Sequence, residues 1–214
     1  EISCSLVGSE MCIRDRSDLD NQIANDRNFK KEYFFDTVLD IGKYHESQYA
    51  LPYEVVPTLM FVNKTLLEQE GIEVPNENWT WSTMEQIVDQ ITKDKNGDGV
   101  IDQFGTYNYT WKEAVYSNGA ELFDKDGKKA FFSGTKVNEA VKFVKKLNEM
   151  NGGREVTQND FDSGNVAFMP LAFSEYRTYK TYPYKIKKYT SFQWDCTSTV
   201  SYTHLRAHET AANL

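Results

Sequence analysis

The stretch 106–123 interleaves aromatic rings with amide, hydroxyl and carboxylate groups. Tyr107, Tyr109 and Trp111 stand there among Asn, Thr and Glu residues. A sugar presents apolar C–H faces and hydroxyl groups, so its binding site needs flat rings beside amide or carboxylate partners. The alternative is that these rings only pack in the core, which is the commoner use of aromatic side chains. We therefore take Tyr107, Tyr109 and Trp111 as candidate ligand contacts.

A second candidate site is the loop 94–105, DKNGDGVIDQFG. A calcium loop carries ligands at positions 1, 3, 5, 7 and 9 and a bidentate Glu at position 12. The first five positions are filled here by Asp94, Asn96, Asp98, Val100 and Asp102. Position 12 is Gly105 rather than Glu. Two interpretations remain: a Ca²⁺ site, and a polar turn whose side chains bond their own backbone.

The segment Ser174, Glu175, Tyr176 and Arg177 combines hydroxyl, carboxylate, ring and guanidinium groups. Such a set suits vicinal hydroxyls or an acidic sugar, so we take Ser174, Tyr176 and Arg177 as further candidate contacts. Arg177 is equally suited to a surface ion pair. No Ser/His/Asp or Cys/His arrangement can be argued, because His45 is the only histidine before the C-terminal stretch.

The elements around these residues alternate between extended and helical patterns. The apolar run 54–62 is interrupted by Pro57, which predicts two extended pieces joined at a bend. Asn63 can N-cap a short helix that Gly71 ends in the left-handed conformation. A helix over 82–92 begins with the S-x-x-E spacing of a capping box. Strand, helix, turn and helix in this order predict an α/β fold.

Further elements follow from hydrophobic periodicity and turn residues. We predict an amphipathic helix over 27–44, a β-hairpin over 123–132 with Asp-Gly at its turn, and a helix over 135–150. A buried strand is predicted over 166–169, directly before the segment of Ser174.

Composition excludes some classes of function. The net charge is −8, which argues against a nucleic-acid or anionic-membrane surface, because both need a basic face. The aromatic and basic segment 181–196 is therefore not read as a nucleic-acid site. No run approaches the roughly 20 apolar residues of a membrane span. Cys4, Cys12 and Cys196 show no metal or disulfide spacing.

The two ends of the chain fit no structural period. Residues 1–16 and 197–214 resemble translated sequencing-adaptor read-through, and we exclude both from fold reasoning as artefactual or disordered tails. The sequence between them reads as an internal fragment of a longer protein.

The pieces LPYEVVPTLMFVNKTLLEQEGIEVP and TWSTMEQI resemble the extracellular solute-binding proteins of ABC importers, in the group that binds sugars and oligosaccharides. The resemblance implies a periplasmic-binding-protein-like fold of type II, present here mostly as its second lobe. It assigns 17–52 to a remnant of the first lobe, 53–57 to a hinge and 58–196 to the second lobe.

The resemblance also implies a function. The chain would be the substrate-binding component of an ABC importer, holding a sugar or oligosaccharide in an interlobe cleft by hinge closure. Tyr53 would lie at the hinge mouth. No catalysis and no cofactor are required, and the expected partners are ABC permease subunits. A monomer is expected, outside the cell as a lipoprotein or in the periplasm.

Two other functions are kept as alternatives. A glycosidase would use two carboxylates, for which Glu54, Glu113, Asp162 and Glu175 are available, although no spacing singles out a pair. A calcium-dependent structural module would use the loop 94–105.

Overall fold

The computed structural model describes residues 17–124, 127–181 and 192–201 of the 214-residue chain. The chain divides into two compact units, Glu1–Val56 and Pro57–Leu214. This boundary falls inside the segment 53–57 that the sequence assigns to a hinge; motion about it stays a prediction.

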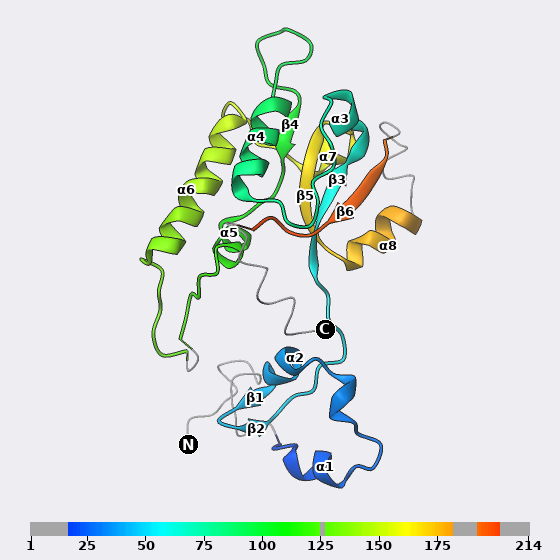
Figure 1. Ribbon diagram of the computed structural model, residues 1–214, viewed down its shortest axis with the longest axis vertical. Coiled ribbons are helices and arrows are strands. Elements are labelled where there is room, and N and C mark those ends of the chain that lie inside the picture. The colour runs from blue at the N-terminus through cyan, green and yellow to red at the C-terminus, as the bar shows by residue number, and fades with distance from the viewer. Residues whose placement is uncertain (1–16, 125–126, 182–191, 202–214) are drawn as a thin grey trace, which may run out of the picture. The chain divides into compact units, whose positions relative to one another are not determined.

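The first unit contains little regular structure (Figure 1). Its elements are α1 (Asp20–Asn25), the 3₁₀ helix η3 (Lys31–Tyr33), α2 (Asp36–Asp40), and the antiparallel pair β1 (Lys43–Tyr44) and β2 (Ser47–Gln48). The continuous helix predicted over 27–44 is therefore wrong. Phe35 and Ile41, two apolar residues of this range, are exposed. A short helix needs an apolar surface to pack on, and among the described residues of this unit only Leu39 and Gln48 are buried.

The second unit is built on a four-stranded mixed sheet with the order β4-β5-β3-β6. Strand β3 pairs antiparallel with both of its neighbours, and β4 runs parallel to β5. Its elements in chain order are β3 (Thr58–Asn63), α3 (Lys64–Gln69), α4 (Trp81–Ile91), β4 (Phe104–Thr106), α5 (Trp111–Ser117), α6 (Thr135–Met150), α7 (Gln158–Asp162), β5 (Val166–Ala172), α8 (Ser174–Thr181) and β6 (Trp194–Thr197).

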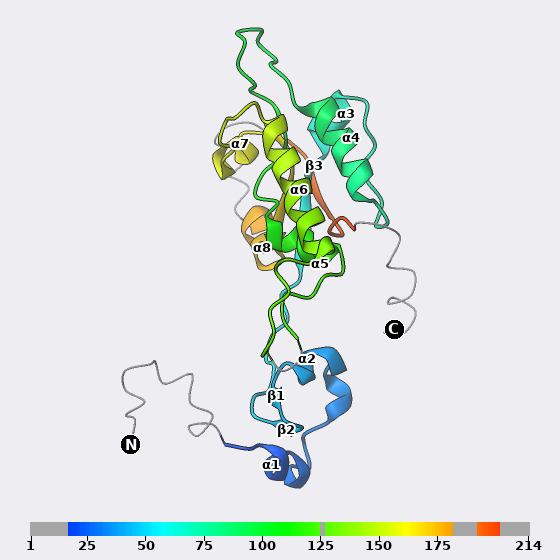
Figure 2. The same cartoon turned by 90° about the vertical axis from the view of Figure 1, so that its left-hand side faces the viewer.

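Helices cover both faces of this sheet, and β3 shows why. Successive side chains of a strand point to opposite faces. Met60 and Val62 join the cluster beneath α3, α4, α5 and α6, whereas Phe61 joins the cluster beneath α7 and α8. Figure 2 shows α3 and α4 on one side of the sheet and α7 and α8 on the other. The predicted α/β class is confirmed.

Local signals define most of the element boundaries. The predicted cap at Asn63 is confirmed, since its Oδ1 accepts a hydrogen bond from Leu66 N at 3.0 Å. Gly71 has a φ of 69°, as its predicted stop position requires. The capping box predicted at Ser82 is wrong, because α4 begins at Trp81 and its N-cap is Thr80.

Two other predictions concern the long loop and the C-terminal stretch. The hairpin predicted over 123–132 is reduced to one bridge between Phe123 and Ala130, and residues 125–126 lie outside the described part. Thr197, the first residue of the predicted tail 197–214, ends β6, and residues 198–201 pack at the start of α4. Val200 is buried there, and Ser201 O accepts from Trp81 N at 3.0 Å.

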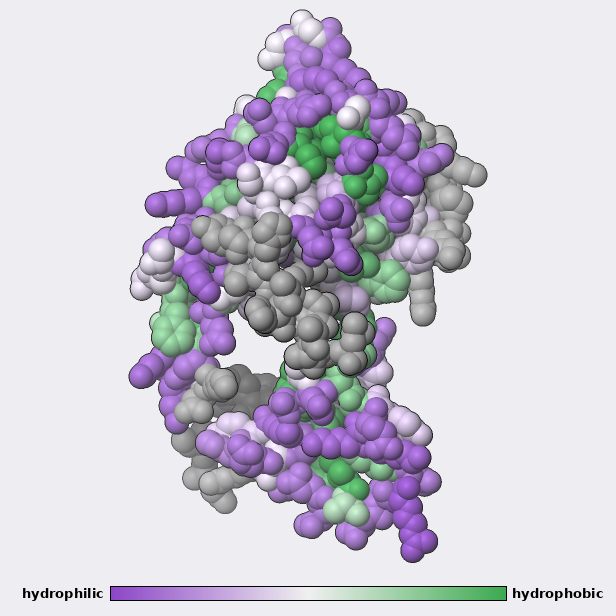
Figure 3. All heavy atoms as spheres, in the orientation of Figure 1, coloured by the Kyte–Doolittle hydropathy of each residue, from purple (hydrophilic) through white to green (hydrophobic). Residues whose placement is uncertain are grey.

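On the face shown in Figure 3, hydrophilic residues cover most of the second unit, and hydrophobic residues appear in small groups. Among the described residues, none of the helices is both long enough and apolar enough to cross a membrane.

Candidate functional site

The edge of the second unit at which the chain enters β3 contains a pocket of about 660 Å³. Thr58 begins β3 and lies opposite Ala172, the last residue of β5. The backbone N–H of Phe173 donates to Pro57 O at 2.8 Å, and this bond joins the residue before β3 to the residue after β5. We call this cavity the Thr58 pocket, and its lining includes Thr58, Lys112, Glu113, Tyr116, Lys136 and Ser201.

Helix α5 supplies one wall of the Thr58 pocket. Thr110 caps the helix in a box with Glu113, whose Oε2 accepts from Thr110 N at 3.0 Å. Ala114 and Val115 are buried against the core. Tyr116 of the same helix is 67% exposed and lines the pocket.

The Thr58 pocket has two lysines on its walls. Lys136 Nζ donates to Gly119 O at 3.0 Å, and Lys112 Nζ lies 5.9 Å from the centre of the Trp111 ring. Neither lysine forms an ion pair with a carboxylate in the part of the chain that the structure describes. The pocket therefore offers N–H donors beside an exposed ring, a combination that suits hydroxyl groups.

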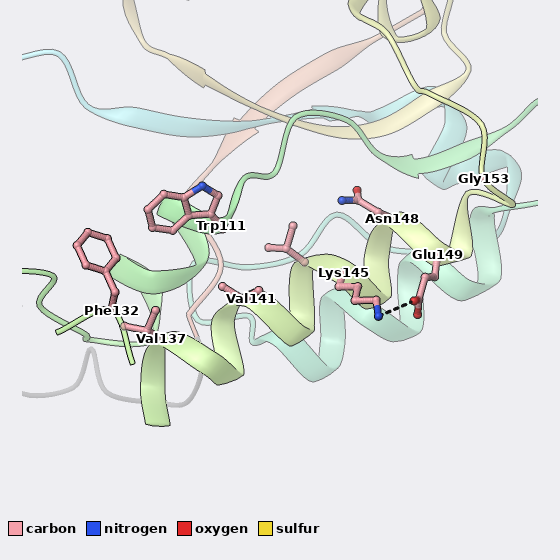
Figure 4. A pocket seen from close by; sticks show the side chains of 9 residues that line it. Trp111, Phe132, Val137, Val141, Lys145, Asn148, Glu149 and Gly153 are labelled. Carbon is pink, nitrogen blue, oxygen red and sulfur yellow. Dashed lines mark ion pairs between the residues drawn. The ribbon is translucent and has the colours of Figure 1, made fainter. Parts of the chain in front are cut away.

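The aromatic residues predicted from the stretch 106–123 do not share one pocket. Tyr109 is 5% exposed, and its hydroxyl hydrogen-bonds Ser117 Oγ at 3.1 Å. Burial raises the pKa of Tyr109 to about 12. Tyr107 is half-buried at a separate pocket of about 450 Å³, and Trp111 lines a groove of about 830 Å³ along α6 (Figure 4). Their ligand contacts stay predictions.

The remaining predicted contacts lie in α8 and in the first unit. Ser174 is exposed at the start of α8, while the Tyr176 ring packs against Phe173 and Trp194. The side chain of Arg177 lies outside the described part. Tyr53 belongs to the first unit, where it is 97% exposed.

The loop 94–102 uses its polar side chains to bond its own backbone. Asp94 accepts from Gly99 N and Gly97 N, both at 2.6 Å, and these bonds hold the pKa of its carboxyl below the ordinary value, the Gly99 bond most. Asn96, Asp98 and Asp102 each accept from one backbone N–H. Across the described residues, no group of three or more His, Cys, Asp or Glu side chains is placed to hold a metal. The Ca²⁺ site stays a prediction.

The carboxylates considered for glycosidase chemistry are dispersed. Glu113 is engaged in the cap of α5, and Asp162 is a buried residue of α7 that accepts from the Tyr179 hydroxyl at 2.7 Å. Glu175 lies in α8, and Glu54 belongs to the first unit.

None of the residues that line the Thr58 pocket is among the ligand contacts predicted from the sequence, and the missed residues include Thr58, Lys112, Tyr116 and Lys136. Lys112 and Tyr116 are four residues apart, so they share one face of α5, and this spacing is a signal that could have been used. Thr58 and Lys136 come from elements far apart in the chain and carry no such signal.

The second unit has a mixed sheet between two sets of helices, and the chain matches solved structures of type II periplasmic binding proteins over part of their length. An ABC substrate-binding protein from Listeria monocytogenes, solved with cycloalternan, superposes with a TM-score of 0.68 at 19% identity, covering 88% of this chain and 49% of that one. The sugar-binding protein MalE from Xanthomonas citri gives 0.67 at 18%, covering 87% and 48%. This chain therefore spans about half the length of these structures.

The chain belongs to the bacterial extracellular solute-binding protein family, whose model matches residues 16–195. No curated protein matches the chain significantly in sequence.

Proposed function

We propose that the chain forms part of the substrate-binding component of an ABC importer and takes up a sugar or oligosaccharide at the Thr58 pocket. The observation that carries this proposal is the family match over 16–195, in a fold whose solved neighbours include proteins crystallised with saccharides. Supporting it, the pocket sets the Tyr116 ring beside two lysines without carboxylate partners in the described part of the chain.

The proposed mechanism is capture without covalent chemistry. Closure about residues 53–57 would select the ligand-bound form, and the boundary between Val56 and Pro57 supports a hinge there. The partners we propose are the permease subunits of the importer, with the protein acting as a monomer outside the cell, either lipid-anchored or periplasmic.

Isothermal titration with maltotriose and with mannobiose tests the binding function. We expect saturable binding that is weak, with a dissociation constant on the order of 1 mM, because a single open pocket orders few ligand groups. Tyr116→Ala should weaken binding about fivefold or more, since it removes the exposed ring. Ser82→Ala, an exposed change on α4, is the matched control. No saturable heat with any saccharide would contradict the proposal.

Incubation with aryl glycosides and with both saccharides tests the absence of catalysis. We expect all of them to be recovered unchanged. Hydrolysis that is abolished by Glu113→Gln or Asp162→Asn would make the protein a glycosidase instead.

A further inference from the structure

The chain contains three Asn-Gly dipeptides, whose asparagines are Asn96, Asn118 and Asn151. In such a pair the asparagine side chain can cyclise onto the backbone nitrogen of the glycine, because glycine has no Cβ to obstruct the approach. Asn118 and Asn151 directly follow α5 and α6 and are only 1% and 5% exposed. Asn96 is exposed in the loop between α4 and β4, which projects from the second unit in Figure 1. The fold therefore places three identical dipeptides in different surroundings.

Two hydrogen bonds fix the dipeptide at Asn96. Its Oδ1 accepts from Asp98 N at 2.8 Å, which closes an Asx turn. Gly97 N lies within the same hydrogen-bonded ring as the side-chain carbonyl of Asn96, and it donates to Asp94 Oδ1 at 2.6 Å. A Cβ added at Gly97 would meet no atom within 4 Å beyond its chain neighbours, so the dipeptide has room to cyclise.

These two bonds match what cyclisation requires. Attack of Gly97 N on Asn96 Cγ places negative charge on Oδ1, and Asp98 N already donates to that atom, within the range of about 2.7–3.1 Å at which such donors act. The proton of Gly97 N is directed at Asp94 Oδ1, within reach of a transfer. An N–H bond lies in the peptide plane, whereas the nitrogen attacks perpendicular to that plane. The bond to Asp94 therefore leaves the attack unobstructed.

The dipeptide at Asn118 lacks the proton acceptor. Gly119 N donates to Tyr116 O at 3.0 Å, and a backbone carbonyl is too weakly basic to take up the proton. The side-chain amide of Asn118 donates to Lys136 O at 2.8 Å, which holds the buried side chain in place. Cyclisation there would have to break this bond.

The dipeptide at Asn151 lacks both the acceptor and the donor. Gly152 N donates to Glu149 O at 3.2 Å, which is again a backbone carbonyl. Asn151 Oδ1 is buried and has no hydrogen-bond partner in the described part of the chain, so nothing there would stabilise negative charge on it. Burial also keeps water, which must hydrolyse the cyclic product, away from this atom.

We propose that Asn96 is a site of spontaneous deamidation, promoted by the loop that contains it. Gly97 N forms a bond to Asn96 Cγ and gives its proton to the Asp94 carboxylate. The bond between Cγ and Nδ2 then breaks, and Nδ2 takes that proton and leaves as ammonia, which gives a cyclic imide. One water molecule opens the imide at either carbonyl carbon and leaves an aspartate or an isoaspartate at position 96. No oxidant or reductant is involved, and the proposal does not rest on saccharide binding.

The modification changes both the charge and the geometry of the loop. It adds a negative charge to a segment that already contains Asp94, Asp98 and Asp102. An isoaspartate also lengthens the backbone by one methylene group, which displaces the N–H groups that bond to Asp94. We therefore expect the modified loop to be less ordered.

Peptide mapping of the aged full chain by mass spectrometry tests the proposal. The protein is incubated near neutral pH in heavy-oxygen water, with EDTA so that no cation occupies Asp94. We expect Asn96 to be converted at least tenfold faster than Asn118 and Asn151, with one labelled oxygen in each product. The synthetic peptide 93–102 serves as the unfolded reference, and it should deamidate at least threefold more slowly than the loop of the full chain.

A variant assigns the proton transfer to Asp94. Asp94→Asn keeps an oxygen that can accept from Gly97 N but is not a base, and we expect it to lower the rate at Asn96 at least threefold. The NMR signals of the Gly97 and Gly99 amides show whether the variant keeps the turn. Asp89→Asn, which changes an exposed carboxylate on α4, is the matched control and should leave the rate unchanged.

Three results would overturn the proposal. Equal rates at the three asparagines would show that their surroundings do not select Asn96. A full chain that deamidates at Asn96 no faster than the peptide would show that the fold does not promote the reaction. An unchanged rate in Asp94→Asn with the turn intact would show that Asp94 does not accept the proton.

Discussion

Two buried tyrosines make the stability of the second unit sensitive to alkaline pH. Burial raises the pKa of Tyr109 to about 12, and burial together with the bond to Asp162 raises the pKa of Tyr179. A raised folded-state pKa means that the folded protein resists ionisation more than the unfolded chain does. The resulting stability is complete below pH about 10 and is lost as pH rises through the folded-state values.

Urea unfolding at pH 8 and pH 11.5 measures this loss. We expect the free energy of unfolding to fall by roughly 1–3 kcal/mol more in wild type than in the Tyr109→Phe, Tyr179→Phe double variant. Since the lysines titrate in both proteins, the difference isolates the phenols. Equal losses in the two proteins would show that neither hydroxyl is held neutral by the fold.

The Asp94 loop should keep its turn without a metal. Its carboxylate accepts from two backbone N–H groups, so we expect Asp94→Ala to lower the thermal midpoint in the presence of EDTA. Asp89→Ala, an exposed change on α4, is the control.

A Ca²⁺ titration of wild type and Asp98→Asn tests whether the loop binds calcium. If EDTA alone lowers the wild-type midpoint, the loop depends on a cation.

At the scale of residues, the sequence predicts which side chains could contact a sugar better than it predicts which of them lie together. Tyr109 and Trp111 have rings that suit a sugar. Tyr109, however, is buried, and Trp111 lines the groove along α6. Tyr109 precedes α5, and Trp111 is its first residue; sequence spacing alone leaves this helix start undetermined.

At the scale of elements, the start of α4 shows which of two candidate residues, Thr80 or Ser82, is the N-cap. Thr80 Oγ1 accepts from Thr83 N, whereas Ser82 lies inside the helix and is exposed. We expect Thr80→Ala to cost about 0.5–2 kcal/mol in chemical unfolding, the usual range for a lost N-cap. Ser82→Ala should stay within about 0.5 kcal/mol of wild type. If Ser82→Ala instead destabilised the protein more than Thr80→Ala, the capping box predicted at Ser82 would be correct.

Elements with a strong period and a packing surface are those that the sequence predicts well. Helix α6 and strand β5 occur where predicted, because their apolar faces meet the two cores. The helix predicted over 27–44 has a comparable apolar pattern but exposes Phe35 and Ile41. Periodicity cannot reveal whether a partner surface exists, and the free energy of a short helix depends on one.

At the scale of the whole molecule, the two units should differ in stability. The second unit contains both hydrophobic clusters, whereas the described part of the first buries only Leu39 and Gln48. We expect native-state hydrogen exchange to be fast throughout 17–56 and slowest in β3 and β5. Limited proteolysis should then remove 17–56 and leave a product that begins near Pro57. Equal protection of both units would contradict this expectation.

The measurement that tests the central claim most directly is hydrogen exchange of the full chain with and without saturating maltotriose. If the Thr58 pocket takes the saccharide, protection should rise in the segment 112–119, which forms a wall of that pocket, and Tyr116→Ala should need a higher maltotriose concentration for the same rise. Exchange in 112–119 that stays unchanged while maltotriose is demonstrably bound elsewhere would contradict the account.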